Sequence, residues 1–149
     1  MSGKKRILLA VLLIIIAGAI YIYNEYNRTN ANISSEKPAF TVQATELLNA
    51  FTADDSAASN KYVGKIISIT GLVKNMNQDE RGYYTLSLGD TSSMSSVRCS
   101  VDSMYTDRAT AIKPGMIIKI KGNCTGFNED ELLGLDVIVN RCVIEENGY

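Results

Sequence analysis

Hydrophobic and polar residues alternate along the second half of the chain, and this pattern predicts β-strands, whose side chains point alternately to opposite faces. The first predicted strand, "GKIISITGLVKNM", begins at Gly64 and places Ile67, Ile69, Gly71 and Val73 on one face. A glycine in mid-strand is typical of a bulge or a sharp bend. Four shorter runs, "YYTLSLGD", "VRCSV", "MIIKIKGNC" and "LDVIVNRCVIEE", predict four further strands.

The later strands alternate in the same way. Their predicted inward positions are Tyr84, Leu86, Leu88, Val97, Cys99, Val101, Met116, Ile118, Ile120 and Cys124. Residues 102–113 break the alternation and predict a short helix, which Pro114 and Gly115 end. Three strands, a short helix and two strands predict a mainly β fold, a five-stranded Greek-key barrel of the OB type. An SH3-like barrel is the main alternative, but it usually lacks the helix.

Helical spacing precedes the strands. Ala44, Leu47, Leu48 and Phe51 recur at the spacing of one helix face, and two acidic residues at 54 and 55 favour a second helix start. We therefore expect two short helices, or one bent helix, across about residues 43–62. This N-terminal helical segment would cover one open end of the barrel.

A charge-free apolar run, Ile7–Tyr23, follows the basic residues Lys4, Lys5 and Arg6. It is at the short end of a membrane-spanning length, and the basic flank favours a cytoplasmic N-terminus. The run therefore predicts a single transmembrane helix. The alternative is a signal peptide cleaved near the small residues 17–19, although the apolar run continues past them.

These patterns predict four regions along the 149-residue chain. They are a basic cytoplasmic tail at 1–6, a transmembrane anchor at 7–23, a polar linker at 24–40 and an OB-like domain with its N-terminal helices at 41–149. The predicted location is a bacterial cell membrane, crossed once, with the C-terminal domain outside the cytoplasm.

Charge and composition narrow the chemistry of that domain. Residues 38–149 contain 10 lysines and arginines and 14 acidic residues, a net charge of −4. An acidic domain is unfavourable for nucleic-acid binding, because phosphate neutralisation supplies most of its non-specific affinity. The chain has no histidine, the commonest general base and a common zinc ligand. We therefore predict no enzymatic activity, no cofactor and no metal site.

Three cysteines, Cys99, Cys124 and Cys142, all fall in predicted strands. Outside the cytoplasm, three cysteines suggest one disulfide and one thiol left over. A Cys124–Cys142 bond is favoured, with Cys99–Cys142 as the next pairing, and a bulge in the last strand could change the face of Cys142. The alternative is three reduced thiols that pack as small apolar residues.

OB barrels usually bind ligands on the outer face of their first three strands. The predicted candidates on this face are Tyr83, Thr85, Ser87, Arg98 and Ser100, with Lys74 at the rim. Aromatic stacking contributes about 1–3 kcal/mol per base in proteins that bind single strands. One tyrosine and one arginine are few for that purpose, so an ordinary solvated sheet face is the alternative interpretation.

Several motifs resemble the tRNA_anti-like family of bacterial envelope proteins, whose members are often described as nucleic-acid-binding lipoproteins. The motifs are "ELLNAF" before "KYVGKIISITGLV", then "VRCSV" before "IKPGMIIKIKGNCTG", and finally "DVIVNRCVI". The resemblance covers about residues 41–145 and implies an OB-like barrel outside the inner membrane, but it implies no particular activity. Many members are lipoproteins, whereas this chain has no lipobox cysteine, so a protein helix would attach it to the membrane.

Two functions follow as hypotheses. The first is an envelope module that binds a protein partner or a small ligand. The alternative is binding of single-stranded nucleic acid or another anionic polymer. A redox or metal-handling role for the odd cysteine is a third, weaker hypothesis, because the chain has no Cys-x-x-Cys motif and no histidine to lower a thiol pKa.

Overall fold

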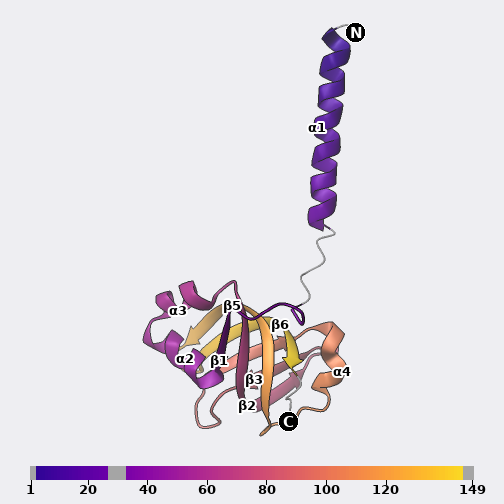
Figure 1. Ribbon diagram of the computed structural model, residues 1–149. Coiled ribbons are helices and arrows are strands. Elements are labelled where there is room, and N and C mark those ends of the chain that lie inside the picture. The colour runs from indigo at the N-terminus through magenta and orange to yellow at the C-terminus, as the bar shows by residue number, and fades with distance from the viewer. Residues whose placement is uncertain (1–2, 27–32, 146–149) are drawn as a thin grey trace. The chain divides into compact units, whose positions relative to one another are not determined.

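The computed structural model describes residues 3–26 and 33–145 (Figure 1). The chain divides into two compact units, residues 1–32 and 33–149, which are described separately here. Parts of the predicted tail (1–2), linker (27–32) and OB-like domain (146–149) lie outside the described residues.

The first unit contains one helix, α1 (Gly3–Tyr26), which includes the whole predicted run at 7–23. Its side chains from Leu12 to Tyr23 are all exposed. Within the described part of the chain, no helix combines the length and the hydropathy needed to cross a bilayer. The transmembrane anchor therefore stays a prediction.

The second unit is built around a closed barrel of five strands, which confirms the predicted OB architecture. The strands are β2 (Ile66–Gln78), β3 (Tyr84–Leu88), β4 (Ser96–Val101), β5 (Ile117–Asp130) and β6 (Gly134–Glu145). Their order is β2-β3-β4-β6-β5, and β2 also pairs with β5, so the barrel closes. The β4–β6 pair is parallel, and the other pairs within the barrel are antiparallel.

One strand was not predicted. β1 (Phe40–Gln43) pairs in parallel with Ile67–Thr70 of β2, on the edge of β2 opposite the one that pairs with β5. The segment before it is also attached to the barrel: Ile33 is buried, and the buried ammonium of Lys121 donates to the carbonyl oxygens of Ser34 (2.9 Å) and Glu36 (3.0 Å). Residues 33–36 of the predicted linker therefore pack against the domain.

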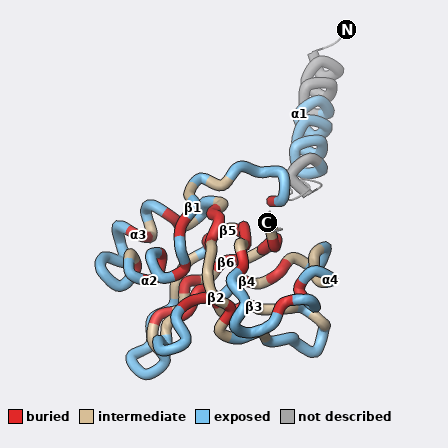
Figure 2. The backbone as a smooth tube through the Cα atoms, turned by 60° about the horizontal axis from the view of Figure 1, so that its bottom comes forward, coloured by how far each residue is buried: buried red, intermediate tan, exposed pale blue. Residues whose placement is uncertain are grey.

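Helical segments flank the barrel (Figures 1 and 2). α2 (Ala44–Ala53) and α3 (Asp55–Tyr62) lie beside one end, as the two-helix prediction required, and the short η1 (Ser103–Tyr105) and α4 (Thr106–Ala109) connect β4 to β5. The Asp54 carboxylate accepts a hydrogen bond from the Ala57 backbone N–H at 2.8 Å and so caps α3. The Phe51 ring of α2 lies 5.2 Å from that of Phe127, which anchors the helix on β5.

The core follows the predicted alternation. Its fully buried members include Ile67, Ile69, Val73, Leu86, Leu88, Val97, Cys99, Ile120, Cys124, Val137 and Val139. Met116 is an exception at 42% exposure, because it precedes β5 and lies outside the alternating strand. The buried positions form a continuous lining inside the barrel (Figure 2).

Gly71 is required by close packing. A Cβ atom at this position would lie 2.7 Å from the Cβ of Ala44 and 3.3 Å from that of Leu88. The predicted irregularity of this strand lies two residues later, where the β2–β3 register shifts between Val73 and Asn75. The glycine thus admits the start of α2, and the bulge bends the strand.

Replacing Gly71 with alanine should reduce the free energy of unfolding by about 1–3 kcal/mol, because the added methyl overpacks the contact with Ala44. Urea denaturation measures the loss. The double variant Gly71→Ala/Ala44→Gly should recover at least about 0.5 kcal/mol relative to additive effects, since it removes the atom that clashes. Fully additive losses would contradict the packing explanation.

Candidate ligand-binding face

The outer face of the barrel carries a row of side chains that crosses three strands. The register aligns Asn75 of β2 with Ser87 of β3, and Ser87 with Arg98 of β4. Ile138 of β6 continues the row beyond Arg98. All four side chains are at least partly exposed. The row is therefore a continuous outer surface on which a ligand could lie.

A second row runs parallel to the first. Asn77 is opposite Thr85, and Thr85 is opposite Ser100. The structure thus brings together Thr85, Ser87, Arg98 and Ser100, four of the six predicted site residues. It adds two amides that the prediction omitted, Asn75 and Asn77. The omission has a physical reason, because the bulge after Val73 shifts the alternation of β2 by one residue.

Arg98 is the only cation in these two rows, and its charge is already paired. Its Nε lies 2.9 Å from the Oδ2 atom of Asp136, while the hydroxyl of Ser96 donates to Oδ1 of the same carboxylate at 2.6 Å. The Arg98 side chain is still 57% exposed, so it can make hydrogen bonds to a ligand. The face itself is consequently close to neutral and rich in hydroxyl and amide groups.

Both loops at the edges of this face are acidic. The β2–β3 turn contains Asp79 and Glu80 with Arg81, and the β5–β6 hairpin tip contains Glu129, Asp130 and Glu131. All six side chains are exposed. None of the three hairpin carboxylates forms an ion pair within residues 33–145. A polyanion lying along the face would therefore meet negative charge beside it.

The remaining two predicted residues lie away from the rows. Tyr83 is in the turn before β3, where its backbone N–H donates to the Asp79 carboxylate at 2.8 Å, and the residue is 47% exposed. Lys74 is displaced by the bulge, and its ammonium donates to the carbonyl oxygens of Ser93 and Ser95 (2.8 Å to Ser95). Lys74 therefore holds the β3–β4 loop in place and does not contribute a free charge to the face.

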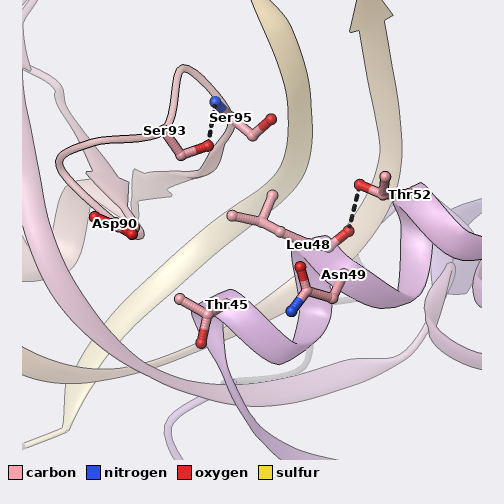
Figure 3. A pocket seen from close by; sticks show the side chains of 7 residues that line it. All are labelled: Thr45, Leu48, Asn49, Thr52, Asp90, Ser93 and Ser95. Atoms are coloured by element: carbon pink, nitrogen blue, oxygen red, sulfur yellow. Dashed lines mark hydrogen bonds between the residues drawn. The ribbon is translucent and has the colours of Figure 1, made fainter.

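A pocket of about 500 Å³ lies between α2 and this β3–β4 loop (Figure 3). Its lining residues are mainly hydroxyl-, amide- and carboxylate-bearing: Thr45, Leu48, Asn49, Thr52, Asp90, Ser93 and Ser95. Figure 3 shows the Leu48 side chain directed from the helix toward the loop. Hydrogen bonds from the backbone and hydroxyl of Ser92, together with the charge of Lys74, hold the pKa of Asp90 below its ordinary value. The pocket can therefore bind a small polar ligand by hydrogen bonds.

Sequence reasoning missed this pocket. Thr45, Asn49 and Thr52 have the i, i+4, i+7 spacing of one helix face, which was a usable signal. Nothing local, however, indicates that the serine-rich loop at 91–96 folds back toward that helix.

The three cysteines are buried free thiols, so the predicted Cys124–Cys142 disulfide is wrong for this structure. The β5–β6 register places Val139, and not Cys142, opposite Cys124. Cys142 instead faces Gly122, where its Sγ would lie 2.7 Å from an added Cβ atom. Gly122 and Cys124 are two residues apart in β5, which corresponds to about 7 Å along the strand and is beyond the usual Cα–Cα distance of a disulfide.

The bulge that the sequence analysis allowed for in the last strand is present. Arg141 has a φ of 54°, and the pairing of β6 with both neighbours shifts near it. Val137 and Val139 point inward before the bulge, and Cys142 and Ile144 point inward after it. The bulge is therefore what turns Cys142 into the core.

Burial also determines thiol reactivity. Desolvation raises the pKa of Cys124, and desolvation followed by the neighbouring Cys99 raises the pKa of Cys142 well above the ordinary value. A protonated, buried thiol is a poor nucleophile and a poor metal ligand. Among the described residues no group of three histidine, cysteine or acidic side chains could hold a metal ion. These thiols act as small apolar residues of the core.

The closed five-stranded barrel and its partly exposed polar face define an OB-fold domain. The chain belongs to the tRNA_anti-like family, whose model matches residues 1–143. This confirms the family resemblance. A comparison with curated proteins found no match.

One solved structure supports the fold. A "putative nucleic acid-binding lipoprotein" from Klebsiella pneumoniae is similar over 70% of this chain and 91% of its own, with a TM-score of 0.56 and 14% identity. The Schizosaccharomyces pombe Stn1–Ten1 complex is less similar, with a TM-score of 0.36 and 21% identity over 55% of this chain and 59% of its own. An Entamoeba histolytica asparaginyl-tRNA synthetase has a TM-score of 0.39 and 14% identity over 54% of this chain and 20% of its own. At these identities the similarity to the lipoprotein shows a common fold.

The buried thiols predict how stability depends on pH. The pKa of Cys124 and of Cys142 is higher in the folded than in the unfolded state. The contribution of these protonated thiols to the free energy of unfolding is therefore complete below the unfolded thiol pKa, about 8.5, and is lost as pH rises toward the folded-state pKa. Urea denaturation should therefore show stability falling between about pH 8.5 and pH 10, by at most about 2 kcal/mol for each such thiol. The Cys142→Ala variant should be less stable at pH 7 but should lose correspondingly less between pH 7 and pH 10.

Reductant provides the control for this prediction. Because the thiols are free, adding reductant at pH 7 should leave the denaturation midpoint unchanged. A decrease in stability of about 3 kcal/mol on reduction would instead indicate a structural disulfide.

Proposed function

We propose that this protein is a membrane-tethered binding module whose OB domain lies outside the cytoplasm. Its ligand is a protein partner or a small molecule that is uncharged or cationic, and the domain catalyses no reaction. The single observation that carries this proposal is the charge distribution of the outer face, where the Arg98 charge is paired and both flanking loops are acidic.

The charges on and beside the outer face favour some classes of ligand over others. Binding of a nucleic-acid backbone draws its non-specific affinity from lysines and arginines that neutralise phosphates. Here the hairpin tip presents three carboxylates that lack ion-pair partners within residues 33–145. Like charges placed side by side at an interface are unfavourable and suppress binding of the wrong partners. The hydroxyl and amide groups of the two rows suit a neutral or positively charged surface.

The pocket beside α2 supports the small-ligand form of the proposal. Its volume of about 500 Å³ is within the range of small-molecule sites, about 300–1,000 Å³. Its polar lining favours a ligand with several hydroxyl or amide groups, and the ionised Asp90 disfavours an anion.

Single-stranded nucleic acid is the second candidate. It is favoured by membership of the tRNA_anti-like family and by the printed description of the Klebsiella lipoprotein. On this chain, Tyr83 and Arg98 would be the stacking and phosphate-binding side chains. Both side chains are exposed enough to take part, at 47% for the Tyr83 residue and 57% for the Arg98 side chain.

An exchange of charge at the hairpin tip separates the two candidates. The full chain should not bind a labelled single-stranded oligonucleotide at low salt, about 50 mM, as measured by fluorescence anisotropy. The variant Glu129→Lys/Glu131→Lys should gain binding that weakens steeply with salt, because it converts the acidic edge of the face into a basic one.

The control variant Glu46→Lys/Asp107→Lys makes the same change in net charge at exposed positions on α2 and α4. It should gain much less affinity than the hairpin variant. Binding of the oligonucleotide by the unchanged chain, with loss of binding in Tyr83→Ala and Arg98→Ala, would establish the nucleic-acid function in place of the one proposed.

The tether is supported by the apolar, charge-free run inside α1 and by the basic residues before it. The described side chains of α1, from Leu12 to Tyr23, are all exposed and are largely apolar. An apolar helix of this kind is stable in lipid, where its backbone hydrogen bonds are satisfied internally.

The full chain should therefore remain in the membrane fraction after an alkaline carbonate wash. Leu13→Lys/Ile16→Lys should release it, since each central lysine costs about 2.5–3.5 kcal/mol on insertion, whereas Leu13→Ala/Ile16→Ala should be retained. Release of the unchanged chain, or a mature N-terminus that begins after residue 19, would contradict the anchor.

A further inference from the structure

Three exposed apolar side chains gather where the β3–β4 loop meets the β5–β6 hairpin. Met94 is 68% exposed, Leu132 81% and Leu133 66%. We call these three residues the apolar tip. The two loops are in contact, since the Leu135 backbone N–H donates to the Ser95 hydroxyl at 3.0 Å, and a Cβ on Gly134 would lie 3.3 Å from the Met94 carbonyl carbon. The two loops that carry the three side chains are therefore adjacent on the surface of the domain.

The apolar tip is held in a defined conformation by hydrogen bonds. The Asp130 carboxylate accepts from the backbone N–H groups of Leu132 (2.8 Å) and Leu133 (3.0 Å), which fixes the turn. Lys74 donates to the carbonyl oxygens on both sides of Met94, those of Ser93 and Ser95. A loop whose backbone is already fixed loses less entropy on binding, so the backbone of this surface is preorganised for a partner.

Contiguous apolar patches on a protein surface often mark interaction sites. Methionine adapts its shape to a partner, and leucines supply area that is favourable to remove from water. Acidic side chains lie beside the apolar tip, since Glu129, Asp130 and Glu131 directly precede the leucines and are all exposed. The partner must therefore combine apolar side chains with positive charge.

We propose that the apolar tip is a docking site for a basic, apolar segment of a partner protein. Its apolar side chains contact Met94, Leu132 and Leu133, and its lysines or arginines face Glu129 and Glu131. This inference rests on the proposed function and deepens it, because it names the chemistry of the partner. The apolar interior of a membrane is another environment that could cover these side chains. The three carboxylates disfavour an anionic membrane surface by like-charge repulsion.

The site lies next to the polar face described above. Asp136 is opposite Ser96 in the β4–β6 pairing and binds Arg98, and the apolar tip begins only a few residues away at Leu133. A partner segment that binds the apolar tip can therefore extend along the row of Arg98, Ser87 and Asn75. The tip gives affinity through apolar contact, and the rows give hydrogen bonds.

The chain contains no tryptophan, so Leu133→Trp introduces a single fluorescent reporter at the tip. The experiment uses the full chain in nanodiscs of neutral lipid, and the probe is a short synthetic peptide of alternating lysine and leucine. We expect the emission of this tryptophan to shift to shorter wavelength as the peptide is added. A Met104→Trp reporter, at a 73% exposed methionine on η1, should show no shift.

Two matched probes and two variants make the test specific. Peptides with glutamate in place of lysine, or serine in place of leucine, should not shift the emission. In the Leu133→Trp background, Leu132→Ser/Met94→Ser should weaken binding of the lysine–leucine peptide about tenfold. Glu129→Gln/Glu131→Gln should weaken it several-fold and reduce its salt dependence. Asp130 is left unchanged because it forms the turn.

The outcomes distinguish the docking site from the proposed function. An equal response at the two reporters, or unchanged affinity in Leu132→Ser/Met94→Ser, would overturn the docking site while leaving the protein-binding proposal standing. Emission that is already shifted before peptide is added would place the apolar tip in lipid and would also overturn it. Failure of the proposed function has a separate sign, namely oligonucleotide binding by the unchanged chain.

Discussion

The structure depends above all on the pairing of β2 with β5, because this pairing closes the barrel. Seven consecutive residue pairs join the two strands, from Ile66 with Asn123 to Leu72 with Ile117. The N-terminal half of β2 forms this seam, and its C-terminal half pairs with β3 after the bulge at Val73–Asn75. β2 therefore pairs with β5 through its first half and with β3 through its second half. Closure leaves no open edge between these strands, which removes a template for pairing with another chain.

Closure also separates the chemistry of the domain into an inner and an outer part. Inside, the alternate side chains and three thiols are removed from water, and the raised pKa values of Cys124 and Cys142 keep these two thiols protonated. Outside, the polar rows, the pocket beside α2 and the apolar tip occupy connected strands and loops. The bulge in β2 links these outer features, because it turns Lys74 away from the rows and toward the carbonyl oxygens of the β3–β4 loop.

Local pattern was sufficient to predict the strands, their buried faces and the order that defines an OB barrel, since alternation is a property of neighbouring residues. It could not predict features that depend on register. The disulfide prediction failed because Cys124 is opposite Val139, which only the pairing of β5 with β6 determines. Lys74 was placed on the outer face because Gly71 indicated an irregularity in this strand but not its position, which is between Val73 and Asn75. β1 was missed because four residues are too short for a recognisable period, and the pocket was missed because its two walls are distant in the chain.

The most direct test of this account is a map of nuclear Overhauser contacts across the proposed seam of the barrel in the full chain. The account predicts backbone contacts between Ser68 and Lys121, between Thr70 and Lys119, and between Leu72 and Ile117. Contacts of β2 with β3 and of β5 with β6, in the absence of any contact between β2 and β5, would describe an open sheet. That result would contradict the closed barrel and every surface derived from it.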